Sequence, residues 1–93
     1  MEKIRFIVDG RVQGVGFRYF VLRQAEHLNI TGWVRNNMDG SVEILAKGEA
    51  VAVSDFLNCC LKGPLFSKVT SHLFKDLTQE DESSLETGFH ILR

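Results

Sequence analysis

The chain has 93 residues and a formal net charge of −1, and 44% of its residues are hydrophobic and 25% charged. This length suits one domain spanning residues 1–93 and leaves no room for a second, and the composition excludes a disordered or fibrous chain. Domains that hold nucleic acid through its phosphates are usually clearly basic, so the charge argues against a nucleic-acid partner.

The first third of the chain predicts a strand, a glycine-rich loop and a helix. Residues 3–9 alternate between two sets of side chains, with Ile4, Phe6 and Val8 on one side, which is typical of a half-buried strand. After the loop, apolar side chains recur at helical spacing, and they are Phe17, Phe20, Val21, Ala25 and Leu28.

The middle of the chain predicts a hairpin followed by a second helix. Residues 30–36 and 41–46 are short β-prone runs, and Asp39-Gly40 between them supplies the positive φ angles that a tight hairpin prefers. The second helix carries apolar residues at helical spacing, and they are Val53, Phe56, Leu57, Cys60 and Leu61. Gly63-Pro64 ends it.

The last third of the chain predicts two more strands. Residues 67–76 alternate again, residues 78–87 are polar and predict an exposed loop or hairpin, and residues 88–93 predict a short closing strand. The acidic run Glu80-Asp81-Glu82 is expected to be solvated. The order β-α-β-β-α-β plus a short terminal strand predicts an α+β fold: a ferredoxin-like split βαβ sandwich, with a mostly antiparallel sheet and two helices on one face.

The stretch from Gly10 to Arg18 is the sharpest local signal. Its three glycines, Gly10, Gly14 and Gly16, stand between a predicted strand and a predicted helix. Glycine allows positive φ, so successive amides can point into one concavity, and the helix adds its own unpaired amides and Arg18 in its first turn. These features suit a bound phosphate, although a strand-to-helix turn that merely needs glycine remains an alternative.

Two nucleotide motifs do not fit this loop. A dinucleotide fingerprint that starts at Gly14 needs glycine at position 19, where Tyr19 stands. A P-loop that starts at Gly10 needs glycine and then lysine at the positions of Val15 and Gly16. The loop therefore predicts an anion site of another kind.

Two motifs at their separation resemble the acylphosphatase family. They are Gly10-Arg-Val-Gln-Gly-Val-Gly-Phe-Arg18 and Gly32-Trp-Val-Arg-Asn36, followed by Asp39-Gly-Ser-Val-Glu43, Gly63-Pro64 and Phe89. The resemblance covers nearly the whole chain and implies hydrolysis of the carboxyl–phosphate bond of acyl phosphates. It also implies that Arg18 and Asn36 are catalytic, with Asn36 placing the water. The phosphate-binding residues that it implies are Val12, Gln13, Gly14, Val15, Gly16, Phe17 and Arg18. Ile30-Thr31 departs from the usual leucine-containing lead-in, which concerns packing.

The chemistry of an acyl phosphate agrees with these residues. It is a mixed anhydride whose leaving carboxylate needs no general acid, so catalysis reduces to stabilising phosphoryl charge and placing one water. No metal and no cofactor is expected. Strand parity puts Asn36 on the side of Val34 and opposite Trp33 and Arg35. If Val34 faces the helices, Asn36 lies at the rim of the same layer as Arg18.

Other polar and aromatic residues predict structural roles. His27, His72 and His90 show no metal-ligand spacing. Cys59 and Cys60 are adjacent, so they cannot link distant segments, which favours a reducing, cytoplasmic compartment. Cys60 is expected in the core, and Cys59 is expected to be exposed and oxidisable. The phenylalanines are spread as core residues usually are, and they are Phe6, Phe17, Phe20, Phe56, Phe66, Phe74 and Phe89.

Three functions from different classes follow. The first is a metal-independent acyl phosphate hydrolase, the second a non-catalytic phosphate-binding or acyl-phosphate-binding module of the same fold, and the third an RNA-binding sheet. The third ranks last because Trp33 lacks the paired exposed aromatics of such sheets. The expected ligands are a small-molecule acyl phosphate and inorganic phosphate or sulfate, without nucleic acid or membrane. We expect a monomer that acts as a free hydrolase and not as a module of a larger protein.

Overall fold

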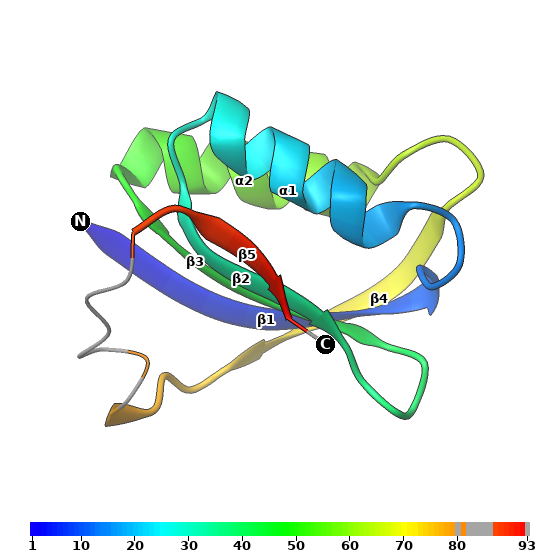
Figure 1. The fold of residues 1–93 in the computed structure, drawn as a ribbon. Helices are drawn as coiled ribbons and strands as arrows, with labels where there is room; N and C mark the ends of the chain where they lie inside the picture. Colours follow the sequence, from blue (N-terminus) through cyan, green and yellow to red (C-terminus); the bar gives the residue numbers. More distant parts are fainter. Residues whose placement is uncertain (80, 82–86, 93) are drawn as a thin grey trace.

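The structure is a computed structural model that describes residues 1–79, 81 and 87–92. These residues form five strands and two helices in the order that the sequence predicts (Figure 1). The elements are β1 (Glu2–Arg11), α1 (Phe17–His27), β2 (Thr31–Asn36), β3 (Val42–Gly48), α2 (Ala50–Lys62), β4 (Lys68–Lys75) and β5 (Phe89–Leu92). Residues 80, 82–86 and 93 of the predicted polar stretch and closing strand lie outside the described residues.

The strands form one sheet in the order β4-β1-β3-β2-β5. β1 pairs antiparallel with β3 and β4, β2 pairs antiparallel with β3, and β5 runs parallel to β2. Both helices lie side by side on one face of this sheet (Figure 1). The predicted split βαβ sandwich, with its mostly antiparallel sheet, is confirmed.

The core fills the layer between the sheet and the helices. Phe6 and Val8 of β1 are fully buried, as the alternation predicts, and α1 and α2 bury the apolar side chains that recur at helical spacing. The buried core residues are Phe6, Val8, Val12, Phe17, Val21, Ala25, Ile30, Val34, Val42, Ile44, Ala46, Val53, Phe56, Cys60 and Phe89. Cys60 is in the core as expected, and Cys59 is half-buried.

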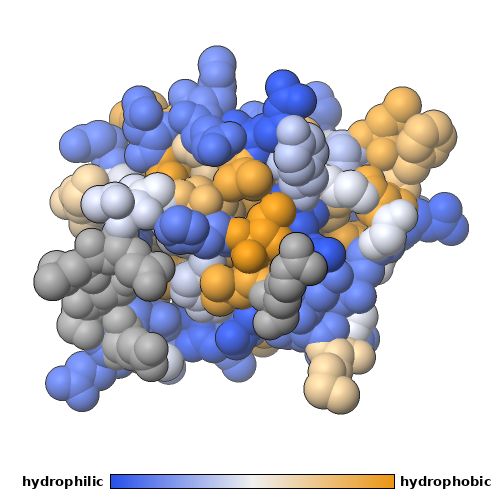
Figure 2. Space-filling model, viewed as in Figure 1, coloured by the Kyte–Doolittle hydropathy of each residue, from blue (hydrophilic) through white to orange (hydrophobic). Residues whose placement is uncertain are grey.

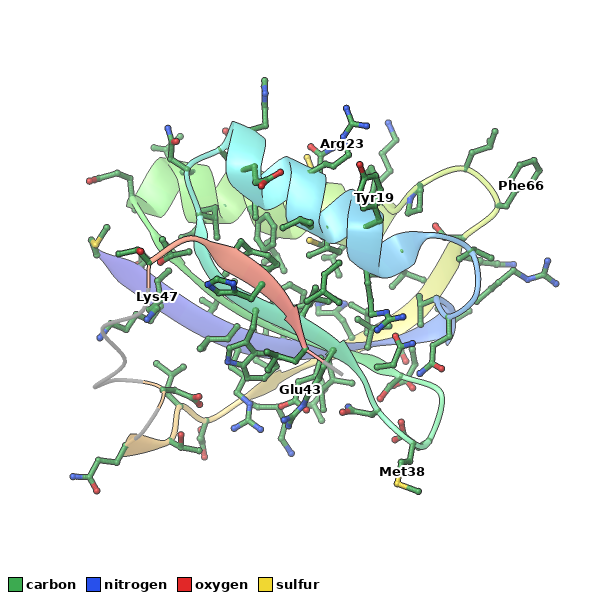
Figure 3. The ribbon with its side chains drawn as sticks, in the orientation of Figure 1. Tyr19, Arg23, Met38, Glu43, Lys47 and Phe66 are labelled. Atoms are coloured by element: carbon green, nitrogen blue, oxygen red, sulfur yellow. The ribbon has the colours of Figure 1, made fainter. Side chains whose placement is uncertain are left out.

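Two of the seven phenylalanines are not core residues, which corrects the sequence prediction. Phe74 pairs with Phe6 across β1 and β4, but β4 is an edge strand and leaves the Phe74 side chain 51% exposed. Phe66 lies in the loop between α2 and β4, has a φ of 73° and is 77% exposed. Periodicity cannot reveal that a strand lies at the edge or that a loop side chain points outward, as Phe66 does in Figure 3.

The predicted hairpin between β2 and β3 is present, but only one of its two predicted positive φ angles is. Only Gly40 of the predicted pair has a positive φ, 95°. The Asn37 amide donates to the Ser41 carbonyl at 2.8 Å, and the Gly40 amide donates to the Asn37 carbonyl at 3.2 Å. The Asp39 carboxylate accepts from the Ser41 hydroxyl at 2.6 Å and the Ser41 amide at 2.9 Å, and these bonds lower the pKa of Asp39. Backbone bonds and the Asp39 carboxylate together fix this hairpin.

An ion network covers the other face of the sheet. Glu43 is 3% exposed and accepts from Arg5 Nε at 2.6 Å and from Arg35 Nη2 at 3.1 Å. Burial alone would raise the pKa of Glu43, but the hydrogen bonds from Arg5 and Arg35 outweigh it and hold that pKa below its ordinary value. Arg35 also stacks on Trp33, with Cζ 4.8 Å from the ring centroid.

Asp81 joins this network, which corrects its predicted solvation. It is 8% exposed, and its carboxylate lies 3.5 Å from Arg5 Nη1 and accepts from the Thr78 amide at 3.0 Å. A run of acidic residues usually faces water, but here one member pairs with an arginine on the inner strand β1. This pair holds the start of the connection from β4 to β5 against the sheet.

Candidate active site

The loop between β1 and α1 begins later than the sequence predicts. β1 continues through Gly10 and Arg11, with a bulge between Asp9 and Gly10. A Cβ at Gly10 would lie 2.0 Å from the Lys68 carbonyl oxygen, so this glycine permits the close approach of β4. Gly10 therefore belongs to the strand and not to the anion cradle.

Gly14 and Gly16 shape the loop itself. Both have a φ of 75°, and a Cβ at either would meet no heavy atom within 4 Å. These two positions therefore need glycine for conformation and not for space. Left-handed residues on both sides of Val15 are the backbone arrangement that turns successive amides into one concavity.

The backbone amides of residues 14–19 are available to a ligand. In the part of the chain that the structure describes, none of them donates to a protein acceptor, and the helical bonds begin with Phe20 donating to Gly16 at 3.0 Å. The first turn of α1 has no acidic residue and no side-chain cap. The partial positive charge of this helix end is thus open to an anion.

The loop, α1, β2 and β5 line an open pocket of about 300 Å³. Its lining residues are Val12, Gly14, Gly16, Phe17, Arg18, Tyr19, Asn36 and Ile91. Arg18, as predicted, lies in the first turn of α1, is half-buried and forms no ion pair with any described residue. Its guanidinium is the charged group on the pocket wall and is free to bind an anion.

Asn36 reaches the pocket from β2. It is the last residue of this strand and pairs with Val42, and it lies on the helix-facing side with buried Val34, as strand parity predicts. Its side chain is exposed and makes no hydrogen bond to the described residues. The structure therefore brings Arg18 and Asn36 to the same pocket from separate elements.

Two of the predicted phosphate-binding residues do not line the pocket. The Gln13 side chain turns away and donates from Nε2 to the carbonyl oxygens of Asn37 at 2.9 Å and Ser41 at 2.8 Å. Val15 packs against the core. The side chains of Gln13 and Val15 are therefore not part of the pocket lining.

Tyr19 and Ile91 line the pocket although the sequence analysis did not place them there. Tyr19 follows Arg18 in α1, and Ile91 pairs with Val34 across the parallel strands β5 and β2. Ile91 lies two residues after the buried Phe89, so strand alternation predicts that both side chains are on the face of the sheet that the helices cover. For Tyr19 the signal was its place next to Arg18 in a helical first turn.

A second hollow lies further along α1. It has a volume of about 560 Å³ and is lined by Arg23, Gln24, Glu26 and His27. The charges there are of both signs, and it lacks the free loop amides. Among the described residues, no three His, Cys, Asp or Glu side chains gather as a metal site would need, and no helix is long and apolar enough to cross a membrane.

Known proteins share both the sequence and the fold. The family model described as acylphosphatase matches residues 4–91. The chain belongs to the acylphosphatase family. An acylphosphatase of Bacillus licheniformis is 57% identical over 89 residues, which cover 96% of this chain and 92% of that protein. The crystal structure of the Bacillus subtilis acylphosphatase superposes with a TM-score of 0.88 and 44% identity and covers all of both chains.

A further solved structure contains a similar unit inside a longer chain. Full-length HypF in its phosphate- and nucleotide-bound form matches with a TM-score of 0.78 and 29% identity, over 98% of this chain and 12% of that one. The full-length acylphosphatase relatives establish the activity: this protein is an enzyme that hydrolyses the carboxyl–phosphate bond of acyl phosphates.

Proposed function

We propose that the phosphoryl group of the acyl phosphate binds to the free amides of residues 14–19 and to the Arg18 guanidinium, and that Asn36 positions the attacking water. The observation that carries this proposal is that backbone amides, an arginine and an amide side chain, none of them paired with a described residue, line one pocket. A unit similar to this chain also forms part of HypF, whose full-length structure is in a phosphate- and nucleotide-bound form.

The reaction needs only what these groups supply. The water oxygen attacks phosphorus, and the bond between phosphorus and the carboxyl oxygen breaks, so carboxylate and inorganic phosphate are formed. The carboxylate leaves as a stable anion, and the proton lost by the water passes to phosphate or solvent. Negative charge on the phosphoryl oxygens is met by the planar guanidinium and the backbone amides.

Asn36 fits the role of orienting the water because its amide is both a donor and an acceptor. A carboxylate at this position would repel the phosphoryl group, whereas a neutral amide holds water without that cost. Its place at the end of β2, beside the hairpin that Gln13 anchors, gives it a defined position relative to the loop. Orientation of this kind contributes to the rate by removing the search for a reactive geometry.

Hydrolysis of acetyl phosphate in the presence of a chelator tests the proposal. We expect turnover by the wild-type protein, and a loss of about 10²- to 10³-fold in kcat/KM for Arg18→Ala, because a main charge-stabilising group is removed. Arg18→Lys is expected to remain well below the wild type, since an ammonium cannot make the planar fork. Arg11→Ala is the matched control, because Arg11 is exposed and absent from the pocket. Full activity of Arg18→Ala would refute the proposal.

We also propose that the protein acts as a monomer in a reducing, cytoplasmic compartment. Cys59 and Cys60 are both free thiols, and neighbouring cysteines do not form the cross-links of secreted small domains. Light scattering should give a mass near 10.5 kDa. A stable dimer at micromolar concentration would contradict the monomer.

A further inference from the structure

The pocket is larger than a bound phosphoryl group requires. Its volume of about 300 Å³ is at the lower end of pockets that bind small organic molecules, ~300–1,000 Å³. The free amides, Arg18 and Asn36 account for its polar lining. Of the apolar lining residues, Val12 and Phe17 are 1% exposed, so Tyr19 and Ile91 are the apolar side chains that retain surface for a ligand.

Tyr19 is an exposed aromatic side chain in a fixed setting. It is 60% exposed, lies next to Arg18 in the first turn of α1, and carries the Arg23 guanidinium 5.9 Å from its ring centroid. Figure 3 shows both side chains projecting from the same side of α1. Tyr19 lines the pocket, so its exposed ring offers apolar surface there.

Ile91 supplies the second apolar surface from the other end of the chain. It lies on β5 beside Val34, on the same face of the sheet as Asn36, and is half-buried. Figure 2 shows hydrophobic surface over β5. A group attached to the phosphoryl group held by Arg18 can therefore contact both Tyr19 and Ile91.

We propose that Tyr19 and Ile91 form an acyl subsite, which gives the enzyme a preference for acyl phosphates with an aromatic or bulky apolar acyl group. The proposal rests on the proposed function, because it places the phosphoryl group on the loop amides and Arg18. Tyr19 is a specificity-determining residue here, and its ring packs against the acyl group. An acetyl group is too small to cover this surface, so it gains little from the contact.

The test compares kcat/KM for benzoyl phosphate and acetyl phosphate. For Tyr19→Ala we expect a fall of about 10-fold with benzoyl phosphate and less than about 2-fold with acetyl phosphate, as one lost apolar contact usually gives. Tyr19→Phe keeps the ring and is expected to retain the wild-type preference. Phe66→Ala is the matched control, because Phe66 is an exposed aromatic residue outside the pocket.

The inhibition constant of inorganic phosphate separates failure of this proposal from failure of the proposed function. Tyr19→Ala should leave that constant unchanged, whereas Arg18→Ala should raise it. An equal loss with both substrates, or no loss with benzoyl phosphate, would overturn the acyl subsite. An Arg18→Ala variant with unchanged phosphate inhibition would instead overturn the phosphate site.

Discussion

The Gln13 side-chain nitrogen lies 2.8 Å from the carbonyl oxygen of Ser41, a residue that is fully buried. The same nitrogen donates to the Asn37 carbonyl at 2.9 Å. One amide group thus joins the loop before α1 to the hairpin that begins directly after Asn36. The two halves of the proposed site, which are separate in the sequence, are held together by this contact.

The Gln13→Ala variant should lose both stability and rate. Removing the donor takes from each of the two carbonyl oxygens one of its two hydrogen-bond partners, which costs about 0.5–1.5 kcal/mol per bond in the free energy of unfolding. Because the hairpin carrying Asn36 is released from the loop, we expect kcat to fall about 10-fold or more. Urea denaturation and steady-state kinetics measure the two effects.

Gln24→Ala is the matched control for that variant. Gln24 is a half-buried glutamine on α1 whose side chain makes no hydrogen bond to the described residues. We expect changes within about 0.5 kcal/mol in stability, as for ordinary surface positions. Equal effects of the two variants would show that the Gln13 contact does not hold the site together.

Alanine should lower the free energy of unfolding by different amounts at Gly10 and at Gly14. At Gly14 the new Cβ meets no neighbour, so the cost is that of a left-handed residue, about 1–2 kcal/mol. At Gly10 it would lie 2.0 Å from the Lys68 carbonyl, so β1 and β4 must separate and the free energy of unfolding should fall further. Denaturation should rank Gly10→Ala as the less stable, and the reverse order would contradict the roles given to these glycines.

The contrast between these glycines shows how far sequence reasoning reaches. Alternation and helical spacing were enough to predict the order of the elements and the buried side chains of β1 and α1. They did not separate Gly10, which both its φ and a neighbouring strand require, from Gly14, which its φ alone requires. That distinction depends on β4, more than fifty positions away, and no local pattern contains it.

Stability should fall in acid through Glu43. Its folded-state pKa is lowered by Arg5 and Arg35, so the charged form is favoured by folding. That contribution is present above the pKa of the unfolded chain, about 4.3, and is lost as the pH falls through the lower folded pKa. Unfolding free energies measured by urea denaturation from pH 6 to pH 2 should therefore decline.

Between pH 6 and pH 2, the free energy of unfolding of the Glu43→Gln variant should fall less than that of the wild type. At pH 7 it should be less stable by about 1–3 kcal/mol, because Arg5 and Arg35 lose a charged, buried partner. Glu2→Gln is the control, since Glu2 is exposed and its carboxylate forms no ion pair or hydrogen bond with the described residues. A Glu43→Gln variant with the pH dependence of the wild type would exclude this role of Glu43.

Asn36→Ala should separate the rate from phosphate affinity. Without the amide that orients water, we expect kcat to fall about 10²-fold or more, while the inhibition constant of inorganic phosphate stays within about 2-fold. Asn58→Ala, at an exposed position on α2, should leave both unchanged. A variant of Asn36 that keeps its kcat would remove Asn36 from the mechanism.

The candidate site was only partly predictable from the sequence. Arg18 and Asn36 are predictable because the family motifs contain both, and because strand parity puts Asn36 on the side of the sheet that faces the helices. The resemblance predicts that Gln13 binds phosphate with its loop, yet its side chain turns to the hairpin and donates to the carbonyl oxygens of Asn37 and Ser41. Tyr19 and Ile91 were missed because only the fold brings α1 and β5 to one pocket.

The central claim is that phosphate binds to the free amides between β1 and α1. A titration of 15N-labelled protein with inorganic phosphate, followed by amide NMR with a chelator present, tests it most directly. The largest shifts should fall on the amides of residues 14–19 and on the Asn36 side-chain amide, and should disappear in Arg18→Ala. Shifts centred on Arg23 and His27, with residues 14–19 unchanged, would contradict the claim.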